Sequence, residues 1–424
     1  ANTTGNSNVG VGRRCLEANT TGTNNVAMGQ GACETSTTGS YNTVLGNSAL
    51  NAGSATGNSN VAVGNKALSA STTGYNNIGV GCSALTSVTT GYRNVAVGMN
   101  ALRDATTAVQ NVALGNNAGE NITSDKNVAI GHNALAGATT GEHNTGVGDG
   151  VLANSSTSKN CAFGYHALVN QTTGSYNNAF GHNCMDATVT GPYNNAFGQN
   201  ALGALTGGTK NNAFGQDCMA NLTTGDYNNA FGNSALVNNN ADYNSAFGHD
   251  ALAANTTGSN NVAVGQQSLA TNSTGQQNVA IGSLALNNYT GNANVAVGNQ
   301  ALEDCSTGAA NVAVGHDCAR EVTTGSDNTG IGYAALAALT TGSDNTAVGK
   351  HALNDATTGY RNTCVGNSAG DSITTGFRNT CIGDISGETI TGGEDNTCLG
   401  YNAQTSAASS THQFCLGDAN VSTL

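Results

Sequence analysis

The sequence predicts an all-β protein, a parallel β-solenoid of about 25 coils with roughly 17 residues in each coil. The first observation is a motif, Asn-x-small-large apolar-Gly, which recurs about every 17 residues from Asn8–Gly12 to Asn396–Gly400. The second is the short repeat, because a helix-turn-helix repeat needs about 34 residues or more. The third is its Val-Ala-Val core, which alternates in size and is rich in β-branched residues, as strands are. Together these observations favour stacked coils over a globule with one core.

Each repeat is predicted to form one flattened coil with two strands and two corners. Its consensus reads x-x-Thr-Thr-Gly-x-x-Asn-Val-Ala-Val-Gly-x-x-Ala-Leu-x. The Val-Ala-Val segment predicts the first strand, and the later Ala-Leu pair predicts a second, shorter strand. Gly closes the first strand, and the Thr-Thr-Gly segment predicts a corner whose Gly supplies the positive φ of a tight turn.

The spacing of the repeats varies only around the predicted corner. Successive motif asparagines are 18 residues apart at Asn42 and Asn60, and 16 apart at Asn111 and Asn127. Corners tolerate such insertions and deletions, whereas stacked strands do not. We therefore expect a repeat shaft over residues 1–405 and a terminal coil over residues 406–424.

The asparagine of the motif is present in nearly every repeat, and Gln413 replaces it once. A buried Asn can bond the Asn above and the Asn below through both ends of its amide, which forms a ladder along the solenoid. The alternative is that Asn simply adopts a turn conformation at this position. The ladder hypothesis names Asn25, Asn94, Asn177, Asn211, Asn261 and Asn345 as representative members.

The two faces of the predicted strand differ in size. The residue two places after each Asn is small, and the next residue is large and apolar. Because successive strand residues point to opposite faces, we expect both faces to be buried. One would line the interior of the coil and the other an interface between chains; the sequence does not decide which. In one block the large residue is Phe, which we interpret as repacking of the core, at Phe163, Phe180, Phe197, Phe214, Phe231 and Phe247.

Composition excludes several classes of function. The net charge is -13 and only 9% of residues are charged, so no basic stripe is present to bind nucleic acid. No apolar run approaches the roughly 20 residues that cross a bilayer, so membrane insertion is not expected. Carboxylates are scattered without a fixed pair, and no Ser/His/Asp set can be proposed from spacing. We therefore expect neither an enzyme nor a cofactor.

The 12 cysteines do not follow the pattern of a disulfide framework. Cys364, Cys381, Cys398 and Cys415 are 17 residues apart and replace the small strand residue. Cysteine in an alanine column behaves as a small buried apolar residue. Stacked coils still leave oxidation open. A metal site is not expected in this column, because Cys-only metal sites need ligands that converge tetrahedrally. It is not expected at His182 and Cys184 either, because we interpret the histidines as exposed corner residues.

Aromatic and basic residues gather just before the motif Asn, at the predicted corner. They are Tyr176, Tyr193, Tyr227 and Tyr243, together with Arg93, Arg361 and Arg378, which follow an aromatic residue. Exposed rings can stack on sugars and Arg can pair with acidic glycans, so this row is a candidate for contact with a receptor or glycan. The alternative is that the rings stack on one another and shield the corner.

The Thr-Thr-Gly-x-x-Asn-x-Ala-x-Gly repeats resemble those of phage tail-fibre proteins, in which such repeats precede an endosialidase-type intramolecular chaperone. The Asn-x-Ala-apolar-Gly core is also similar to the head β-roll of trimeric autotransporter adhesins, whose repeat is shorter. The terminal segment Phe414–Leu424 resembles the segment found just before the chaperone.

This resemblance covers essentially the whole chain. It implies a homotrimer, intertwined or side by side, that attaches a virion to a receptor or glycan of its host surface, with a location in the virion tail fibre or at a cell surface. The alternatives are a bacterial surface adhesin or appendage subunit, and an ice- or glycan-binding β-solenoid.

Overall fold

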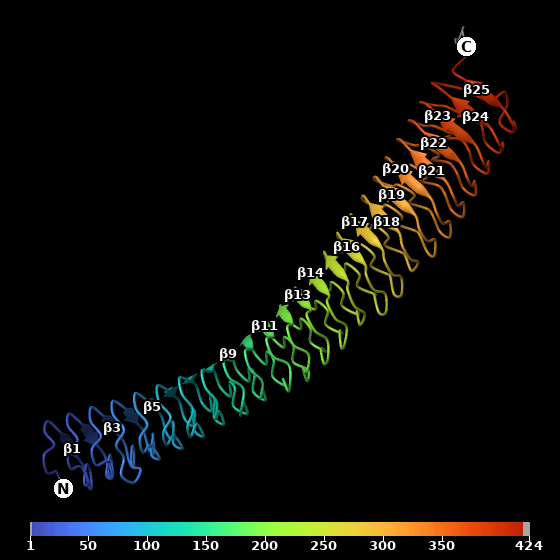
Figure 1. Cartoon of the computed structure of the whole chain (residues 1–424). Helices are drawn as coiled ribbons and strands as arrows, with labels where there is room; N and C mark the ends of the chain where they lie inside the picture. The colour runs from blue at the N-terminus through green and yellow to red at the C-terminus, as the bar shows by residue number, and fades with distance from the viewer. Residues whose placement is uncertain (1, 419–424) are drawn as a thin grey trace. The chain divides into compact units, whose positions relative to one another are not determined.

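The computed structural model describes residues 2–418. This part of the chain contains no helix and forms a parallel β-solenoid of about 24 turns with about 17 residues per turn, as predicted. The chain divides into two compact units, one ending at Asn211 and the other beginning at Asn212. Within each unit the coils lie on one another and their strands follow one side (Figure 1). No helix that could cross a membrane occurs among the described residues.

Every strand is three residues long. The first unit contains β1 (Val9–Val11), β2 (Val26–Met28), β3 (Thr43–Leu45), β4 (Val61–Val63), β5 (Ile78–Val80), β6 (Val95–Val97), β7 (Val112–Leu114), β8 (Val128–Ile130), β9 (Thr145–Val147), β10 (Cys161–Phe163), β11 (Asn178–Phe180) and β12 (Asn195–Phe197). The second unit contains β13 (Asn212–Phe214), β14 (Asn229–Phe231), β15 (Ser245–Phe247), β16 (Val262–Val264), β17 (Val279–Ile281), β18 (Val295–Val297), β19 (Val312–Val314), β20 (Thr329–Ile331), β21 (Thr346–Val348), β22 (Thr363–Val365), β23 (Thr380–Ile382), β24 (Thr397–Leu399) and β25 (Phe414–Leu416).

Neighbouring strands of a unit pair in parallel without a shift of register. Ala62 of β4 lies beside Gly79 of β5, so the small positions of successive coils face each other. The register also holds across the longer coil between β3 and β4, where Thr43 pairs with Val61. The extra residue is therefore absorbed in the turns, because a slip within the strand would turn the small side chains outward.

The interior of each coil is lined by small and medium apolar side chains. In the coil of β4, Ala62, Ala67 and Leu68 are completely buried. The third strand residue points the other way, and Val11 and Leu45 remain 51% and 45% exposed. The structure thus decides between the two faces: the small residues form the core. The face with the large residues stays open within one chain, and its expected burial between chains stays a prediction.

The second strand predicted at the Ala-Leu pair does not form. Lys66 and Leu68 have φ values of 58° and 52°, so a left-handed φ recurs at every second residue and the backbone cannot run extended. Leu68 N–H still donates to Ala84 C=O of the next coil at 3.0 Å. A bulky residue in this conformation costs about 1–3 kcal/mol. Burial of the leucine side chain returns about 1.5–3 kcal/mol, which offsets that strain.

One glycine of the repeat closes the strand as predicted, but the role predicted for the corner glycine is wrong. The corner glycine Gly74 does not have a left-handed φ; its lack of a side chain matters because a Cβ there would lie 2.6 Å from Gly91 O. The corner is held instead by Thr89 C=O, which accepts the N–H groups of Thr72, Thr73 and Gly74 at 3.0–3.2 Å. The positive φ belongs to the glycine that ends the strand, such as Gly64 at 133°.

We expect Gly64→Ala to destabilise the solenoid by about 2 kcal/mol or more, because it combines backbone strain with a steric clash. A Cβ at Gly64 would lie 2.4 Å from Gly81 O and 2.6 Å from Gly81 C in the next coil. Gly53→Ala is the matched control, since a Cβ at Gly53 would meet nothing within 4 Å. Urea unfolding of both variants measures the difference, and equal midpoints would contradict this account of the strand-ending glycine.

Candidate functional site

The most conspicuous surface is the side of the strands that points away from the core, which we call the outer strand face. It consists of the first and third residues of each strand, and the third residue is apolar in every described strand. Neither position holds a charged residue in any of them. Its large apolar side chains that are at least about 36% exposed are Val9, Val11, Val26, Met28, Leu45, Ile78, Val112, Leu114, Phe163, Phe231, Phe247, Val264, Ile281, Ile331, Ile382 and Phe414.

The phenylalanine block belongs to this outer strand face, so its interpretation as a repacked core is wrong. In the first unit the rings of Phe163, Phe180 and Phe197 stack with centroids 4.9 and 4.6 Å apart. Beside them, Asn178 Nδ2 donates to Asn195 Oδ1 at 2.7 Å. The alternation of side chains along a strand explains this error. The Phe ring points to the same face as the first residue of its strand, whereas the Ala between them points into the core.

In the second unit the rings of Phe214, Phe231 and Phe247 stack in the same way, 4.7 and 4.9 Å apart. In such a stack the faces of neighbouring rings contact each other within one chain, whereas the ring edges remain exposed to solvent. Monomeric soluble proteins rarely expose contiguous apolar patches of more than a few hundred Å², and larger patches mark interaction sites. The outer strand face is therefore the first candidate for a functional surface.

The motif asparagines lie inside the coil at its corner and join each coil to the next. Asn77 N–H donates to Asn60 Oδ1 at 3.0 Å, and Asn77 Nδ2 donates to Gly91 C=O at 2.9 Å. Asn77 Oδ1 accepts from the N–H and the Nδ2 of Asn94, at 3.0 and 3.1 Å. The positive φ belongs to the preceding residue, Asn76 at 54°, so the turn conformation is not the role of the motif Asn.

The six representative asparagines share this geometry and are all buried. The backbone N–H of each donates to the amide oxygen of the preceding motif Asn at 2.9–3.1 Å, for Asn25, Asn94, Asn177, Asn211, Asn261 and Asn345. Gln413 keeps the same bond to Asn396 Oδ1 at 3.0 Å. These side chains are inaccessible to a ligand and serve the cohesion of the coils.

The corner tyrosines are exposed and stack in pairs. Tyr176 and Tyr193 are 5.0 Å apart in the first unit, and Tyr227 and Tyr243 are 5.1 Å apart in the second. Lys159 Nζ lies 4.9 Å from the Tyr176 ring centre and donates to its hydroxyl at 2.7 Å. Each ring therefore gives one face to its neighbour, and Lys159 covers the other face of Tyr176, so the predicted contact with sugars would use the ring edges.

The three corner arginines lie beside the aromatic ring that precedes each of them. Arg93 is 5.7 Å from the Tyr92 ring centre in the first unit, and Arg361 is 6.0 Å from that of Tyr360 in the second. Arg361 also lies 3.6 Å from Asp344.

Arg378 is the most strongly engaged of the three arginines. Its guanidinium is 4.8 Å from the Phe377 ring centre and 2.6 Å from the Asp395 carboxylate. The hydrogen bond with Asp395 raises the pKa of Arg378. An acidic glycan would have to compete with that carboxylate, which makes Arg378 a poorer candidate contact than Arg93.

The cysteines are all free thiols. Cys184, Cys218 and Cys318 are buried, and burial raises the pKa of each thiol to about 12. In the 17-residue column, the hydrogen bond with Cys364 raises the pKa of Cys381, and the bond with Cys381 raises that of Cys398. Because the thiolate is the reactive form, these groups are inert in the folded chain.

We expect a maleimide reagent at pH 7 to label Cys82 before any other cysteine, since it is the exposed one. Cys184, Cys218 and Cys318 should react only after unfolding, because burial and a pKa of about 12 leave almost no accessible thiolate. Peptide mass spectrometry after timed labelling checks this order. Early labelling of Cys184 in the native protein would show that its coil opens.

Histidines and carboxylates meet in pairs rather than in larger sets. Among the described residues, no group of three or more His, Cys, Asp or Glu side chains is placed to hold a metal ion. His132 Nδ1 lies 3.1 Å from Asp149 Oδ1, and both side chains are more than half exposed. His182 and Cys184 do not form a pair, because Cys184 is buried and its thiol donates to Ala196 C=O.

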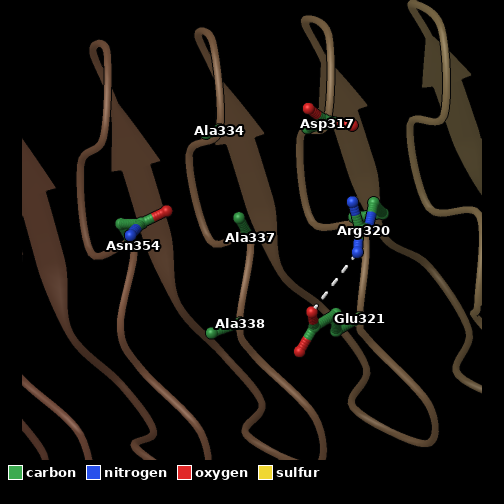
Figure 2. Close-up of a pocket in the computed structure, with 7 residues that line it drawn as sticks. All are labelled: Asp317, Arg320, Glu321, Ala334, Ala337, Ala338 and Asn354. Atoms are coloured by element: carbon green, nitrogen blue, oxygen red, sulfur yellow. Dashed lines mark ion pairs between the residues drawn. The ribbon is translucent and has the colours of Figure 1, made fainter.

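Sequence reasoning missed a groove on the second unit, built by the turn segments that follow the strands β19, β20 and β21. We call it the alanine groove. Figure 2 shows its lining residues on three successive coils: Asp317, Arg320 and Glu321 on one, Ala334, Ala337 and Ala338 on the next, and Asn354 on the third. Its volume is about 250 Å³. The only available signal was three alanines at positions where neighbouring coils have longer side chains.

No protein-family model matches this sequence, and no curated protein resembles it at a significant level. The likeness of the repeats to tail-fibre and adhesin repeats therefore stays a prediction, and the fold and surfaces above are the basis on which a function can be proposed.

Proposed function

We propose that this chain is the shaft of a fibre, a parallel homotrimer that attaches a phage virion to the surface of its host. The outer strand face is the observation that carries this proposal. It presents a column of large apolar side chains along each unit, with no charged residue at the first or third position of any described strand. Depletion of charge in the central part of a surface is typical of protein interfaces.

The energetics of a repeated surface favour association. Covering one exposed Val, Ile, Leu or Phe side chain contributes up to about 1.5–3 kcal/mol. Association costs an estimated 4–15 kcal/mol in lost translational and rotational freedom, a cost that does not grow with the number of coils. Burial of apolar side chains contributes again in each coil, whereas the cost of association is paid once per chain. The summed burial therefore exceeds the cost of association before all the strands have paired with a second copy.

The parallel, in-register solenoid also restricts how copies associate. Two copies that use the same face with a rotation axis along the solenoid bring identical residues together, which gives closed symmetry. The resemblance to tail-fibre repeats implies that this symmetry is threefold. The Phe block of one chain would then meet the same block of its partners, and the open ring edges would be covered.

A cross-linking experiment tests the shared face and its register. In a Cys82→Ser/Cys161→Ser background, which removes the exposed thiol and the one thiol at a first strand position, the Ile331→Cys variant should be joined into covalent dimers by a short bismaleimide, because equivalent residues meet near the axis. The Tyr333→Cys variant is the matched control: this exposed residue lies two positions later in the same coil and is not part of the strand. Cross-linking of Tyr333→Cys alone, or of neither variant, would contradict the proposal.

A bacterial surface adhesin would use the same trimeric shaft, so the outer strand face supports it equally. The proposed virion function predicts an intramolecular chaperone encoded directly after the codon of Leu424, whereas an adhesin predicts a membrane anchor in the full gene. Sequencing the complete gene distinguishes these two sources of the shaft.

Ice binding is favoured by one specific observation. Five consecutive strands carry threonine as their first residue, so a threonine column lies on the outer strand face at Thr329, Thr346, Thr363, Thr380 and Thr397. A monomer with this face exposed should then show thermal hysteresis in freezing experiments. The Thr363→Lys variant should lower it, and absence of hysteresis in the wild type would remove this candidate.

A further inference from the structure

The alanine groove arises from a local loss of side-chain volume. Ala337 is the ninth residue after its motif Asn, and the same position holds Arg320 in the preceding coil and Asn354 in the following coil. Ala334 and Ala338 are short as well, so the coil of β20 contributes only methyl groups to this side (Figure 2). Because coils stack about 4.8 Å apart, the missing layer opens a slot one coil thick.

The backbone beneath the slot is held by hydrogen bonds between coils. Glu321 N–H donates to Ala337 C=O, and Ala338 N–H donates to Asn354 C=O, both at 3.0 Å. The slot therefore exists before any ligand binds. Its volume of about 250 Å³ lies just below the roughly 300–1,000 Å³ of pockets for drug-sized molecules, which suits one small ring.

Polar groups border the slot on both sides. Arg320 and Glu321 form an ion pair at 3.6 Å with side chains that are 41% and 50% exposed, so both heads can reach a ligand. Asn354 borders the opposite side, and its Nδ2 is held by Asp355 Oδ1 at 2.9 Å. A molecule in the slot would meet methyl groups beneath it and hydrogen-bonding groups at its edges.

Asp317 adds a second carboxylate to the lining of the groove. Its Oδ2 lies 2.8 Å from His316 Nδ1, whereas its Oδ1 is buried without a hydrogen-bond partner in the described part of the chain. A buried polar atom of this kind costs about 1–3 kcal/mol unless a partner arrives. Because Oδ1 is closed to solvent, a ligand in the slot would meet the negative charge of Asp317 rather than this atom.

We propose that the alanine groove binds one hexose ring of a glycan, with an amino sugar preferred to an acidic one. The carbon face of the ring would lie on the methyl groups of Ala337 and Ala338, and its hydroxyls would bond Arg320, Glu321 and Asn354. The lining carries two carboxylates and one guanidinium, so a sugar carboxylate is repelled and an ammonium group is attracted.

This inference goes beyond the fibre function and does not depend on the trimer. The groove is built by turn segments after the strands, and none of its residues belongs to the outer strand face. Association through the outer strand face therefore leaves the groove accessible, and a monomer would present it equally.

The test is binding of glucosamine, glucose and glucuronic acid to the full chain, by saturation-transfer NMR and calorimetry. We expect glucosamine to bind with a Kd on the order of 1 mM, the range of a single weak site. The Ala337→Arg variant introduces the residue that the preceding coil has at this position, Arg320, so it should fold. Its side chain would fill the slot, so binding should weaken at least about tenfold. The matched control is Ala253→Arg, at the same position of the coil of β15 and with similar partial exposure.

Retention of binding in Ala253→Arg and its loss in Ala337→Arg would support the groove. No saturation transfer from any of the three sugars, equal binding by Ala337→Arg and wild type, equal loss in both variants, or tighter binding of glucuronic acid would each overturn it. Light scattering on the same samples reports the oligomeric state separately, so failure of sugar binding is distinguishable from failure of the fibre proposal.

Discussion

The double variant Ile281→Asp/Ile331→Asp is expected to dissociate the fibre into monomers while each chain stays folded. Both isoleucines lie on the outer strand face and are about 40% exposed in one chain. In a trimer the two substitutions would bury six carboxylates without partners, and each buried unpaired charge costs several kcal/mol. In a monomer the same carboxylates remain in water, so the stability of the coil itself should change little.

The control for this prediction is Ser283→Asp/Tyr333→Asp, which places the same charges two residues later in the same coils and off the outer strand face. Sedimentation velocity should give a trimer for this control and a monomer for the isoleucine variant. Circular dichroism of both variants should match the wild type. A trimer for Ile281→Asp/Ile331→Asp would show that the chains meet through another surface.

The second large effect is expected for Asn77→Ala. This change removes the acceptor of the Asn94 N–H and the donor to Gly91 C=O, both inside the coil. Two buried backbone groups left without partners cost about 1–3 kcal/mol each, or about 2–6 kcal/mol together. Because coils interact only with their neighbours, the loss should be local to the coils of β4 to β6. Hydrogen exchange of their backbone amides, followed by mass spectrometry, measures this local opening.

Asn65→Ala is the control for burial. Asn65 also donates its amide to an asparagine of the preceding coil, Asn47, at 3.2 Å, but its side chain is exposed. Water replaces that bond, so the change should cost within about 0.5 kcal/mol. If Asn65→Ala and Asn77→Ala shifted the urea midpoint equally, the motif asparagines would not be the main cohesive element.

The strand of each coil was accessible to sequence reasoning because its signals are local. Alternation of Val, Ala and Val and a following Gly suffice to place a strand such as Val95–Val97. The spacing of the motif Asn also predicts stacked asparagines. Strand alternation alone does not decide which face lines the core, because small and large apolar residues can both be buried. The answer depends on the width of the coil, which is set by residues elsewhere in the repeat.

The turn after the strand was not accessible in the same way. Leucine has no preference for a left-handed φ, and only the closed coil forces residues such as Leu102 to 48°. Where the repeat has glycine instead, a larger residue three positions later fills the space: Ile122 Cδ1 would lie 2.9 Å from a Cβ at Gly119. At Gly370 and Gly387 the nearest atom is instead the Sγ of a strand cysteine, Cys364 and Cys381, and the isoleucine three positions later lies farther away. This exchange of volume becomes visible only when both positions are seen to share one interior.

Sequence reasoning found the corner tyrosines and arginines and offered ring stacking as one alternative, but it did not find the carboxylate partners of the arginines. The pairing of Arg378 with Asp395 joins residues 17 positions apart, and it follows from coil stacking. The alanine groove is harder still, because alanine is ordinary at the positions of Ala337 and Ala338, although Ala334 stands where most repeats have a polar residue. Only their coincidence in one coil, next to Arg320 and Asp317, makes a slot.

The measurement that tests the central claim most directly is the mass of the full chain in solution, by multi-angle light scattering over a range of concentrations. The claim is that the outer strand face is covered by further copies of the same chain. It predicts a particle of three times the 42.0 kDa of one chain, stable on dilution. A particle of 42.0 kDa at every concentration would contradict it, and would mean that the outer strand face stays exposed to solvent.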